Sequence, residues 1–407
     1  MSDLKKMYTS LQEDPFPREM TLRLGDAELV FKKKTWTIDG AGKGLRYGEN
    51  PDQPAALFEL TGGELTLGGV TFRGPGKKLV SSMTEENLVQ SGKHPGKINL
   101  TDVDNGLNIL QYLTAKPAAV ILKHNNPCGA AWSEKGLAEA FRAAFASDRI
   151  AAFGGTIVVN RTLDEAAASQ IASSYFEVVA APDFEKKALE ILTSKKNLRI
   201  LALPGLARLE ELAGEPFLDV KSLTDGGMVL QFSFRNKILT KDDFLPAEAV
   251  KGDAAIAARK PTPKEADDLR FAWAVEAGVT SNSVIFARDG ATVAIGTGEQ
   301  DRVGCVELTI QKALTKYADS LAFAEHSMSI YELMLKAGSD PALAEALADI
   351  RKRAQEAKGG LPGSVLVSDG FFPFRDGVDM ALSVGVTAIA QPRSEERRVG
   401  KECRSRW

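Results

Sequence analysis

A lysine and a histidine follow directly on a short apolar run in the first half of the chain. The run AVIL covers residues 119–122, and Lys123 and His124 lead from it into NNPCG at 125–129. Proteins with α/β folds often place catalytic groups where a buried strand ends in a turn, expected here at the Pro and Gly of NNPCG. An imidazole exchanges protons near neutral pH, and an ammonium stabilises developing negative charge. His124 is one of three histidines and is our candidate general base, although such a pair, taken alone, is more often structural.

Two other segments could approach an anion. Arg46 and Tyr47 lie in LRYGENPDQP, where a guanidinium fork and a phenol hydroxyl suit a phosphate group. GTGEQDR at 296–302 places two glycines before an expected helix and ends in Arg302, so that backbone amides can come close to a ligand. Neither segment has the spacing of a Walker loop. Each is weak evidence alone, because an Arg-Tyr pair in a loop is usually on the surface and a single GxG is common.

The stretch FFPFRDGVD at 371–379 combines three phenylalanines with Arg375 and Asp376 at an expected strand-to-helix junction. Core packing alone would account for the aromatic residues. A flat heteroaromatic ligand would account for both the aromatic side chains and the acid, because stacking and hydrogen bonding to ring nitrogens need these groups together.

The elements that must position Lys123 and His124 lie between about 101 and 203, where helical and extended periodicity alternate. We expect, in chain order, a helix at 102–113, a strand at 118–122, a helix at 134–146, a strand at 155–160, a helix opened by a Thr162 and Glu165 capping box, a strand at 177–181, a helix at about 183–195 and a strand at 198–203. This order predicts a helix-covered sheet with largely parallel neighbours.

The flanking regions follow from similar patterns. TLRLGDAELVF alternates apolar and polar positions around Gly25 and Asp26 and predicts a hairpin. Residues 205–260 are punctuated by Gly, Asp and Pro and predict a connector with short helical pieces. After it we expect a helix started by Thr262, Pro263 and Glu265, a hairpin at Asp289 and Gly290, a helical stretch at about 303–357, a strand SVLVS, a helix begun by Arg375 and a strand VTAIAQ.

The predicted organisation is therefore α/β throughout. It has a first unit with the N-terminal hairpin at 1–210, a connector at 211–262 and a second unit with a helical insertion at 263–392. The last residues, RSEERRVGKECRSRW at 393–407, change abruptly in composition, since nine of them are charged. We interpret 393–407 as a non-native tail rather than as a solvated basic tail.

Size and composition exclude several classes of protein. The 407 residues exceed what a single hydrophobic core usually holds, which predicts more than one domain. A net charge of -3 argues against a protein that coats nucleic acid. The sequence has neither an apolar run long enough to cross a bilayer nor a secretory signal, so we expect no membrane partner and a cytoplasmic location. Three cysteines without a CxxC pair predict reduced thiols.

Taken together and in this order, the segments resemble the transformylase domain of the AICAR transformylase / IMP cyclohydrolase family, where AICAR is 5-aminoimidazole-4-carboxamide ribonucleotide. The resemblance spans residues 45–392, and the order of its segments makes it specific although each is modest alone. The stretches that carry it are LRYGENPDQ, GKINLTDVDNGLNIL, LKHNNPCGAA, SDRIAAFGGTIVVN, FEVVAAPDFEKKALEIL, TSNSVIFA, GTGEQDRVGC and SDGFFPFRDGVDMALSVGVTAIAQP.

The resemblance implies a fold and a reaction. The fold would consist of two cytidine-deaminase-like three-layer units in tandem with helical insertions. The protein would act as a homodimer with active sites at the subunit interface. The reaction would transfer a formyl group from the co-substrate 10-formyltetrahydrofolate to AICAR, giving FAICAR and tetrahydrofolate in purine (IMP) biosynthesis.

The resemblance also implies roles for individual residues. His124 matches the family's proton acceptor, and Lys123 matches its transition-state-stabilising neighbour. Val303 and Phe371 match positions beside the folate. The positions that hold AICAR match Arg46, Tyr47, Gly154, Glu177, Asn282, Arg302 and Asp376.

The chain also departs from the family pattern. Bifunctional members carry a cyclohydrolase domain ahead of the RYGENP motif, which begins here at Arg46, so we expect that this chain does not close the purine ring. Asp52 and Asp301 stand where the family usually has His and Ser. The family's C-terminal loop, helix and strand are not recognisable in 393–407, which implies the loss of part of the folate and phosphate sites.

Two alternative functions stay open. A zinc nucleoside deaminase, suggested by the fold family, needs an H-x-E and a P-C-x-x-C set of ligands. No histidine here begins an H-x-E, and Pro127 and Cys128 are not followed by the second cysteine of that motif, so we expect no zinc. The other alternative is a catalytically impaired AICAR-binding homologue, which the altered C-terminus favours. Ribonucleotide binding without turnover would indicate that second alternative.

Overall fold

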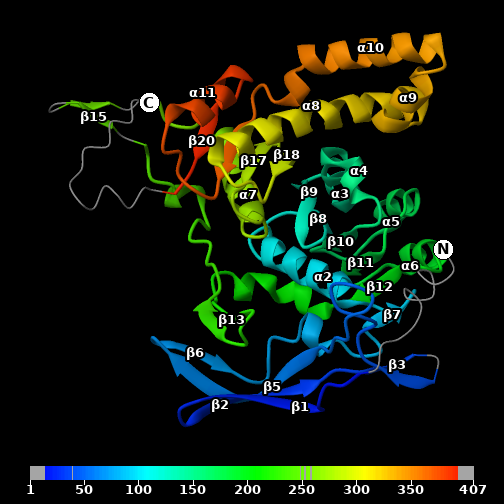
Figure 1. The fold of residues 1–407 in the computed structure, drawn as a ribbon, viewed down its shortest axis with the longest axis vertical. Helices are drawn as coiled ribbons and strands as arrows, with labels where there is room; N and C mark the ends of the chain where they lie inside the picture. Colours follow the sequence, from blue (N-terminus) through cyan, green and yellow to red (C-terminus); the bar gives the residue numbers. More distant parts are fainter. Residues whose placement is uncertain (1–13, 39, 248, 252–253, 257–258, 393–407) are drawn as a thin grey trace. The chain divides into compact units, whose positions relative to one another are not determined.

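A computed structural model describes residues 14–38, 40–247, 249–251, 254–256 and 259–392. Helices and strands occur throughout these residues (Figure 1), which confirms the α/β class. Residues 393–407, interpreted above as a non-native tail, lie outside the described residues.

The described residues form two compact units that interleave along the chain. Within the described ranges, unit 1 comprises residues 14–117, 122–125 and 154–235, and unit 2 comprises residues 118–121, 126–153 and 236–392. The predicted division of the chain at residues 210 and 263 refers to two similar structural units. The compact units described here do not test it, so it stays a prediction.

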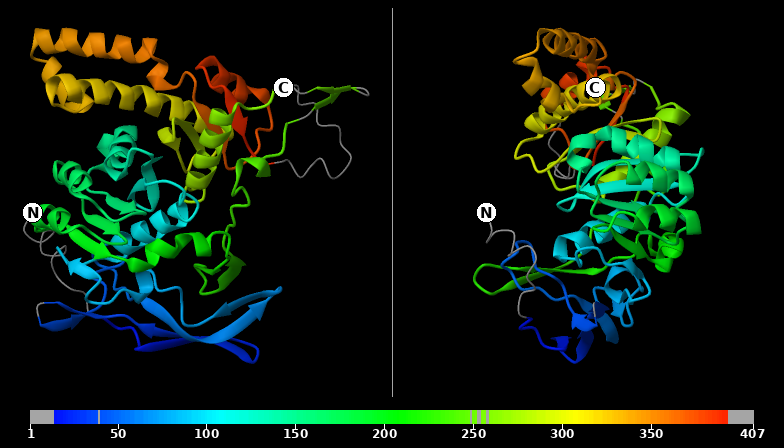
Figure 2. Two further views of the ribbon diagram at one scale, coloured as in Figure 1. Left: turned by 180° about the vertical axis from the view of Figure 1, so that it is seen from behind. Right: turned by 90° about the vertical axis from the view of Figure 1, so that its right-hand side faces the viewer.

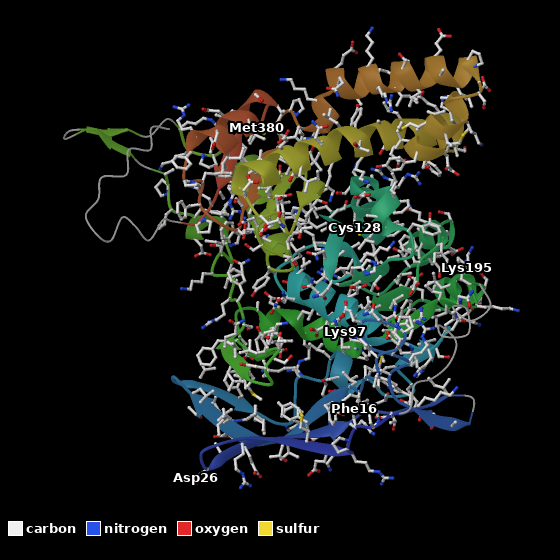
Figure 3. The ribbon with its side chains drawn as sticks, in the orientation of Figure 1. Phe16, Asp26, Lys97, Cys128, Lys195 and Met380 are labelled. Carbon is white, nitrogen blue, oxygen red and sulfur yellow. The ribbon has the colours of Figure 1, made fainter. Side chains whose placement is uncertain are left out.

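Unit 1 contains an antiparallel sheet and a mainly parallel one. Its strands are β1 (Glu19–Leu24), β2 (Ala27–Lys33), β3 (Trp36–Ile38), β4 (Ala41–Lys43), β5 (Phe58–Leu67), β6 (Val70–Arg73), β7 (Leu88–Gln90), the end of β8 (Ala118–Lys123), β10 (Thr156–Val159), β11 (Val178–Ala181), β12 (Arg199–Ala202), β13 (Leu218–Ser222) and β14 (Met228–Phe232). The antiparallel sheet has the order β1-β2-β5-β6, and its first turn, with Asp26 at the tip (Figure 3), confirms the predicted hairpin. Strands β10, β11 and β12 are parallel, as predicted, and β7 pairs antiparallel with β12.

The described residues of unit 1 also contain three α-helices and two 3-10 helices. They are α2 (Lys97–Leu110), α5 (Glu165–Ala172), α6 (Lys186–Thr193), η1 (Val80–Ser82) and η2 (Pro204–Leu212). Helix α2 begins at Lys97 (Figure 3) rather than at the predicted residue 102, because Gly96 is its N-cap and the Asn99 side chain accepts the Gly96 amide at 3.0 Å. The Thr162 capping box was also wrong, because Asp164 accepts the Ala167 amide at 2.7 Å and caps α5 instead.

Helix α2 packs closely on β10 through Gly106. A Cβ atom at this position would lie 2.5 Å from Val158 Cγ2 and 3.1 Å from Leu122 Cδ1. Both of those side chains are fully buried in unit 1. The glycine therefore sets how near α2 lies to the strand, and with it the position of every side chain that α2 presents.

The Gly106→Ala variant is expected to be destabilised by about 1–3 kcal/mol, because the added methyl group overfills a packed contact. Urea unfolding followed by circular dichroism measures the change. The matched control is Gly42→Ala, since a Cβ atom there would have no neighbour within 4 Å. Equal stabilities of the two variants would contradict the prediction.

The predicted connector at 205–260 contains an unpredicted β-hairpin. Short helical pieces occur as expected at η2 and at η3 (Lys241–Asp243). Strands β13 and β14 pair antiparallel, with Leu218 opposite Phe232. The Phe232 ring packs at 5.7 Å from the ring of Phe72 in the antiparallel sheet of unit 1.

Unit 2 is built on a mostly antiparallel sheet with the order β20-β19-β17-β18-β9. Its strands are β9 (Asn126–Trp132), β15 (Ala249–Lys251), β16 (Ala254–Ile256), β17 (Val284–Arg288), β18 (Ala291–Gly296), β19 (Val365–Ser368) and β20 (Ala388–Ala390). The turn between β17 and β18 has positive φ at Asp289 and Gly290, which confirms the predicted hairpin. Only β19 and β20 are parallel among the pairs of this five-stranded order.

Helices cover this sheet and extend beyond it. They are α3 (Leu137–Ser147), α4 (Arg149–Ala152), α7 (Pro263–Glu276), α8 (Arg302–His326), α9 (Ile330–Ala337), α10 (Pro341–Glu356), η4 (Lys358–Gly360) and α11 (Arg375–Ser383). The predicted Thr262 cap of α7 is confirmed, since its hydroxyl accepts the Glu265 amide at 3.2 Å. The predicted stretch 303–357 is three helices, of which α8 and α10 lie side by side (Figure 2). No helix within the described ranges is both long and apolar enough to span a membrane.

Candidate active site

Lys123 ends strand β8, and His124 and Asn125 form the turn before β9, which we call the His124 turn. Both turn residues have positive φ, 53° at His124 and 61° at Asn125, as in the tight turns that histidine and asparagine tolerate best among residues with a side chain. The turn expected at Pro127 and Gly129 was wrong, because those residues lie within β9. His124 is exposed and Lys123 is half-buried, so both can meet a ligand.

Helix α2 holds the His124 turn through both backbone polar groups of Asn125. The Asn125 amide donates to Asp102 Oδ1 at 2.6 Å, and the Asn125 carbonyl accepts from Asn105 Nδ2 at 2.9 Å. Asp102 is 3% exposed, and its Oδ2 also accepts from the Thr156 hydroxyl at 3.4 Å. The backbone that presents His124 is therefore fixed by a buried carboxylate.

The Asp102 carboxyl has an unusual proton affinity. Burial, with a smaller contribution from the charge of Glu177, raises the pKa of Asp102 to about 6. The Asn125 amide, the charge of His124 and the Thr156 hydroxyl act in the opposite direction. The charges of Asp102 and His124 therefore interact, and Asp102 titrates at about pH 6.

Arg46 and Tyr47 form the start of a basic cluster in unit 1. Arg46 is 7% exposed and donates to the Lys93 carbonyl at 2.8 Å and to the Tyr47 hydroxyl at 2.7 Å. The Arg46 amide donates to the Pro95 carbonyl at 3.0 Å, so this segment runs beside the residues that lead into α2. The planar fork of a guanidinium suits the geometry of a phosphate or carboxylate.

A second buried arginine belongs to the same cluster. Arg199 is 2% exposed and donates to Glu177 Oε2 at 3.4 Å and to the His94 carbonyl at 3.3 Å. Burial lowers the pKa of Arg199, the charge of Glu177 opposes this effect, and the charge of Arg46 adds to it. The Nε atoms of both arginines have no hydrogen-bond partner among the described residues. The Arg199 guanidinium contacts a carboxylate, while the Arg46 guanidinium donates to neutral acceptors, which leaves a local excess of positive charge.

Glu177 connects this basic cluster to α2 and to Gly154. Its Oε2 accepts from Asn99 Nδ2 at 3.1 Å, and its amide donates to the Gly155 carbonyl at 3.0 Å. Gly154 has φ of 74°, and a Cβ atom there would lie 3.5 Å from the Tyr175 ring. Unit 1 therefore brings Arg46, Tyr47, Gly154 and Glu177 together, and α2 carries the contacts that link them to the His124 turn.

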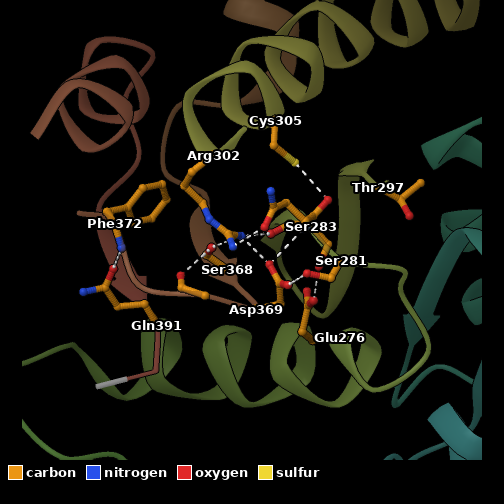
Figure 4. A network of polar contacts seen from close by, with 12 residues as sticks. Glu276, Ser281, Ser283, Thr297, Arg302, Cys305, Ser368, Asp369, Phe372 and Gln391 are labelled. Atoms are coloured by element: carbon orange, nitrogen blue, oxygen red, sulfur yellow. Dashed lines mark hydrogen bonds and ion pairs between the residues drawn. The ribbon is translucent and has the colours of Figure 1, made fainter. Parts of the chain in front are cut away.

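In unit 2, Arg302 is the centre of a polar network (Figure 4). It is the first residue of α8 and forms an ion pair with Asp369, which follows β19. Its guanidinium also donates to Asn282 Oδ1 at 2.6 Å and to the Ser368 hydroxyl at 3.0 Å. The Ser283 amide donates to Asp369 Oδ1 at 2.9 Å. Arg302 and Asn282 are thus in direct contact, which the sequence could not specify.

A buried acid lies behind this network. Glu276, the last residue of α7, accepts a hydrogen bond from the Ser283 hydroxyl through Oε1, while Oε2 has no partner among the described residues. Burial raises the pKa of Glu276 to about 8, the hydrogen bond from Ser283 opposes this, and the charge of Asp369 adds to it. The group is therefore mainly protonated at neutral pH.

Glu276 predicts a pH-dependent stability. The folded state keeps a proton that the unfolded chain, with an ordinary value of 4.5, has lost, so the free energy of unfolding should fall as pH rises from about 4.5 to about 8. The Glu276→Gln variant carries no such proton and should gain stability relative to the wild type across this window. Urea unfolding at several pH values tests this, with the exposed Glu307→Gln as control. A stability difference between the wild type and Glu276→Gln that does not change with pH would contradict this prediction.

The stretch 371–379 separates into core and surface residues. Phe372 is 7% exposed and packs in the core of unit 2, whereas Phe371 and Phe374 are 37% and 74% exposed. Asp376 lies exposed in the first turn of α11, where its Oδ1 accepts the Gly377 amide at 2.8 Å. Core packing accounts for Phe372 but not for the other two rings.

The start of α8 explains one departure from the family pattern. Asp301 is its N-cap and accepts the Gly304 amide at 2.6 Å, a role that serine fills equally well. Val303, the second residue of α8, is half-buried. The aspartate therefore preserves the helix start next to Arg302.

Comparison with known proteins decides the family. A family model described as AICARFT/IMPCHase bienzyme matches residues 18–312. This chain is a member of that family. Its relatives include three bifunctional purine biosynthesis proteins PurH: that of Magnetococcus marinus is 32% identical over 355 residues, 87% of this chain and 55% of that protein. That of Myxococcus xanthus is 32% identical over 94% of this chain and 58% of its own length, and that of Sorangium cellulosum is 34% identical over 86% and 52%.

The chain spans a little over half the length of the AICARFT/IMPCHase relatives that it matches. No group of three or more His, Cys, Asp or Glu side chains that could hold a metal occurs in the described part of the chain. Cys128 and Cys305 are not disulfide-bonded, and burial raises the pKa of the Cys305 thiol to about 11.

Several polar residues of this family member were not predicted from the sequence. Asn99, Asp102 and Asn105 recur at every third position of α2, and this spacing in a buried helix is a usable signal. The other unpredicted residues are single charges within or beside apolar segments, namely Arg199, Glu276 and Asp369.

Proposed function

We propose that this chain transfers a formyl group from 10-formyltetrahydrofolate to AICAR, giving FAICAR and tetrahydrofolate in purine biosynthesis. Membership of the AICARFT/IMPCHase family supports the proposal. The structural observation that carries it is that α2 joins the exposed His124 turn to the buried cluster of Arg46, Arg199 and Glu177. A proton acceptor beside a basic cluster suits the formylation of an anionic amino-nucleotide.

The proposed mechanism uses the two residues at the end of β8. The 5-amino group of AICAR attacks the formyl carbon while His124 accepts the proton that the amine loses. Lys123 stabilises the oxyanion that forms, or protonates the departing folate nitrogen. The amine is a weak nucleophile because its lone pair conjugates with the imidazole ring, so positioning and proton removal supply much of the rate.

Binding roles follow the family resemblance. Val303 and Phe371 are proposed to contact the folate, and the exposed Phe371 ring supports stacking on a pterin. The direct contact of Asn282 with Arg302 supports a shared role for these two. The residues proposed to hold AICAR are Arg46, Tyr47, Gly154, Glu177, Asn282, Arg302 and Asp376.

The repeat architecture of the chain and its assembly into a dimer are also proposals. The two α/β units are proposed to be cytidine-deaminase-like repeats, and the protein is proposed to be a homodimer with active sites at the subunit interface. Light scattering of the purified chain tests the dimer, and a monomeric mass at assay concentration would exclude it. Metal analysis of the same sample tests the expectation that the enzyme uses no zinc.

Tetrahydrofolate release, followed with AICAR present and absent, tests the proposed reaction. We expect release only when AICAR is present, together with formation of FAICAR. AICAR binding without release would indicate the catalytically impaired homologue, and failure of both would exclude the proposal. Adding FAICAR alone and measuring IMP tests the separate prediction that this chain does not close the ring.

A further inference from the structure

We propose that Asp102 is a positioning residue for His124: it holds the His124 turn in place and supplies the negative charge that stabilises the protonated imidazole during formyl transfer. The contact between Asp102 and the His124 turn exists without substrate. Only the stabilisation of the protonated imidazole during formyl transfer rests on the proposed function. Asp102 acts through His124 and does not touch the reacting atoms.

The positioning role follows from the contacts of Asp102 on each side. Its Oδ1 accepts the Asn125 amide at 2.6 Å, directly after His124 in the chain. Its Oδ2 is held by the Thr156 hydroxyl of β10 at 3.4 Å, and the carboxylate is 3% exposed. Asn105 Nδ2 donates to the carbonyl of the same residue, Asn125, at 2.9 Å. The left-handed backbone at His124 is thereby supported by two side chains of α2.

The electrostatic role follows from the charges around Asp102. The charged groups that act on it are His124, whose charge favours the carboxylate, and Glu177, whose charge disfavours it. The Asn125 amide and the Thr156 hydroxyl are the hydrogen-bond donors that favour the carboxylate. Because the attraction is mutual, the Asp102 carboxylate also favours the protonated imidazole that forms when His124 accepts a proton. The burial of Asp102 strengthens this effect, since little water screens the charge.

The Asp102→Asn variant separates charge from shape. Its Oδ1 can still accept the Asn125 amide, whereas the negative charge is gone. We expect kcat to fall about 10- to 100-fold, because proton removal loses part of its contribution to the rate, while the dissociation constant for AICAR changes less than about threefold. The acid limb of the pH profile of kcat should move to lower pH, because the carboxylate that favours the protonated imidazole is gone.

The matched control is Asn105→Ala, which removes the second α2 hydrogen bond to the backbone of Asn125 but keeps the Asp102 charge. It should lower kcat without moving the acid limb. A purely structural role for Asp102 predicts that both variants lower kcat with the limb unmoved, and this result would overturn the proposal. Thermal unfolding of both variants shows whether each is folded at assay temperature.

A readout independent of catalysis distinguishes this proposal from the proposed function. The chain has three histidines, so the ¹⁵N ring signals of His124 can be assigned by comparison with a His124→Asn sample. At a pH near 6.5 we expect the Asp102→Asn ring signals to shift toward those of neutral imidazole, and the Asn105→Ala signals to stay unchanged. This shift in a chain without formyltransferase activity would uphold the pairing and exclude the proposed function. Unchanged signals in Asp102→Asn would overturn the pairing.

Discussion

Replacing His124 with alanine is expected to lower kcat for tetrahydrofolate release by about 100-fold or more, because the attacking amine then lacks its proton acceptor. Alanine also adds backbone strain, since His124 has φ of 53°. Asparagine tolerates that conformation far better, so His124→Asn removes the imidazole with little added strain. Both variants should lose the same activity, whereas only His124→Ala should lose stability. Steady-state kinetics and urea unfolding measure the two effects.

The control for this prediction is His326→Ala, which removes a half-buried imidazole from the end of α8. Its kcat should stay within about twofold of the wild type, because His326 has no place in the proposed site. If His124→Asn kept wild-type turnover, His124 would not be the base, whatever His124→Ala showed.

Replacing Arg46 with methionine is expected to weaken AICAR binding by about 10- to 100-fold, the loss that follows removal of hydrogen bonds from a charged donor. Arg46 is 7% exposed and stands beside the second buried guanidinium, that of Arg199. At saturating AICAR, kcat should change little, because the lost contacts act on the nucleotide rather than on the reacting atoms. Calorimetric titration with AICAR measures the affinity, and turnover at saturation measures kcat.

Arg23→Met is the control for Arg46→Met, since it removes an arginine of β1 whose side chain is 70% exposed and pairs with Glu28. It should leave the affinity for AICAR unchanged. The intermediate variant Arg46→Lys keeps the charge and loses the fork, so its affinity should lie between those of the wild type and Arg46→Met. An unchanged affinity in Arg46→Met would exclude this arginine from the nucleotide site.

Local signals in the sequence predicted much of the fold correctly. The Thr262 cap, the Asp289-Gly290 hairpin and the strand before Lys123 depend on neighbouring residues, and the structure confirms all three. The hairpin of β13 and β14 was missed although Asp225 and Gly226 are a favoured turn pair. Strand β13 alternates apolar and polar residues only over 218–221, and β14 does not alternate, so the many Gly, Asp and Pro residues of the segment suggested an irregular connector.

The candidate site was predicted less completely, because its supporting residues depend on contacts between distant segments. Asp102 was interpreted as the start of a helix, which is where an isolated aspartate commonly lies. In the structure α2 begins earlier, and the carboxylate serves Asn125 instead of its own helix. Arg199 could not be assigned for the same reason, since its partners Glu177 and His94 are remote in the sequence. The sequence predicted the candidate reacting groups, and the structure added the residues that hold the His124 turn.

The interleaving of the two compact units affects how the polypeptide can fold during synthesis. Strand β9 leaves the ribosome early, yet its partner in unit 2 is β18, with Ala131 opposite Ala291. Residues 126–153 must therefore wait for more than a hundred further residues to be translated, with an unpaired strand edge. A nascent chain of this kind gains from chaperone protection, and no single cut in the gene would release either unit as one continuous fragment.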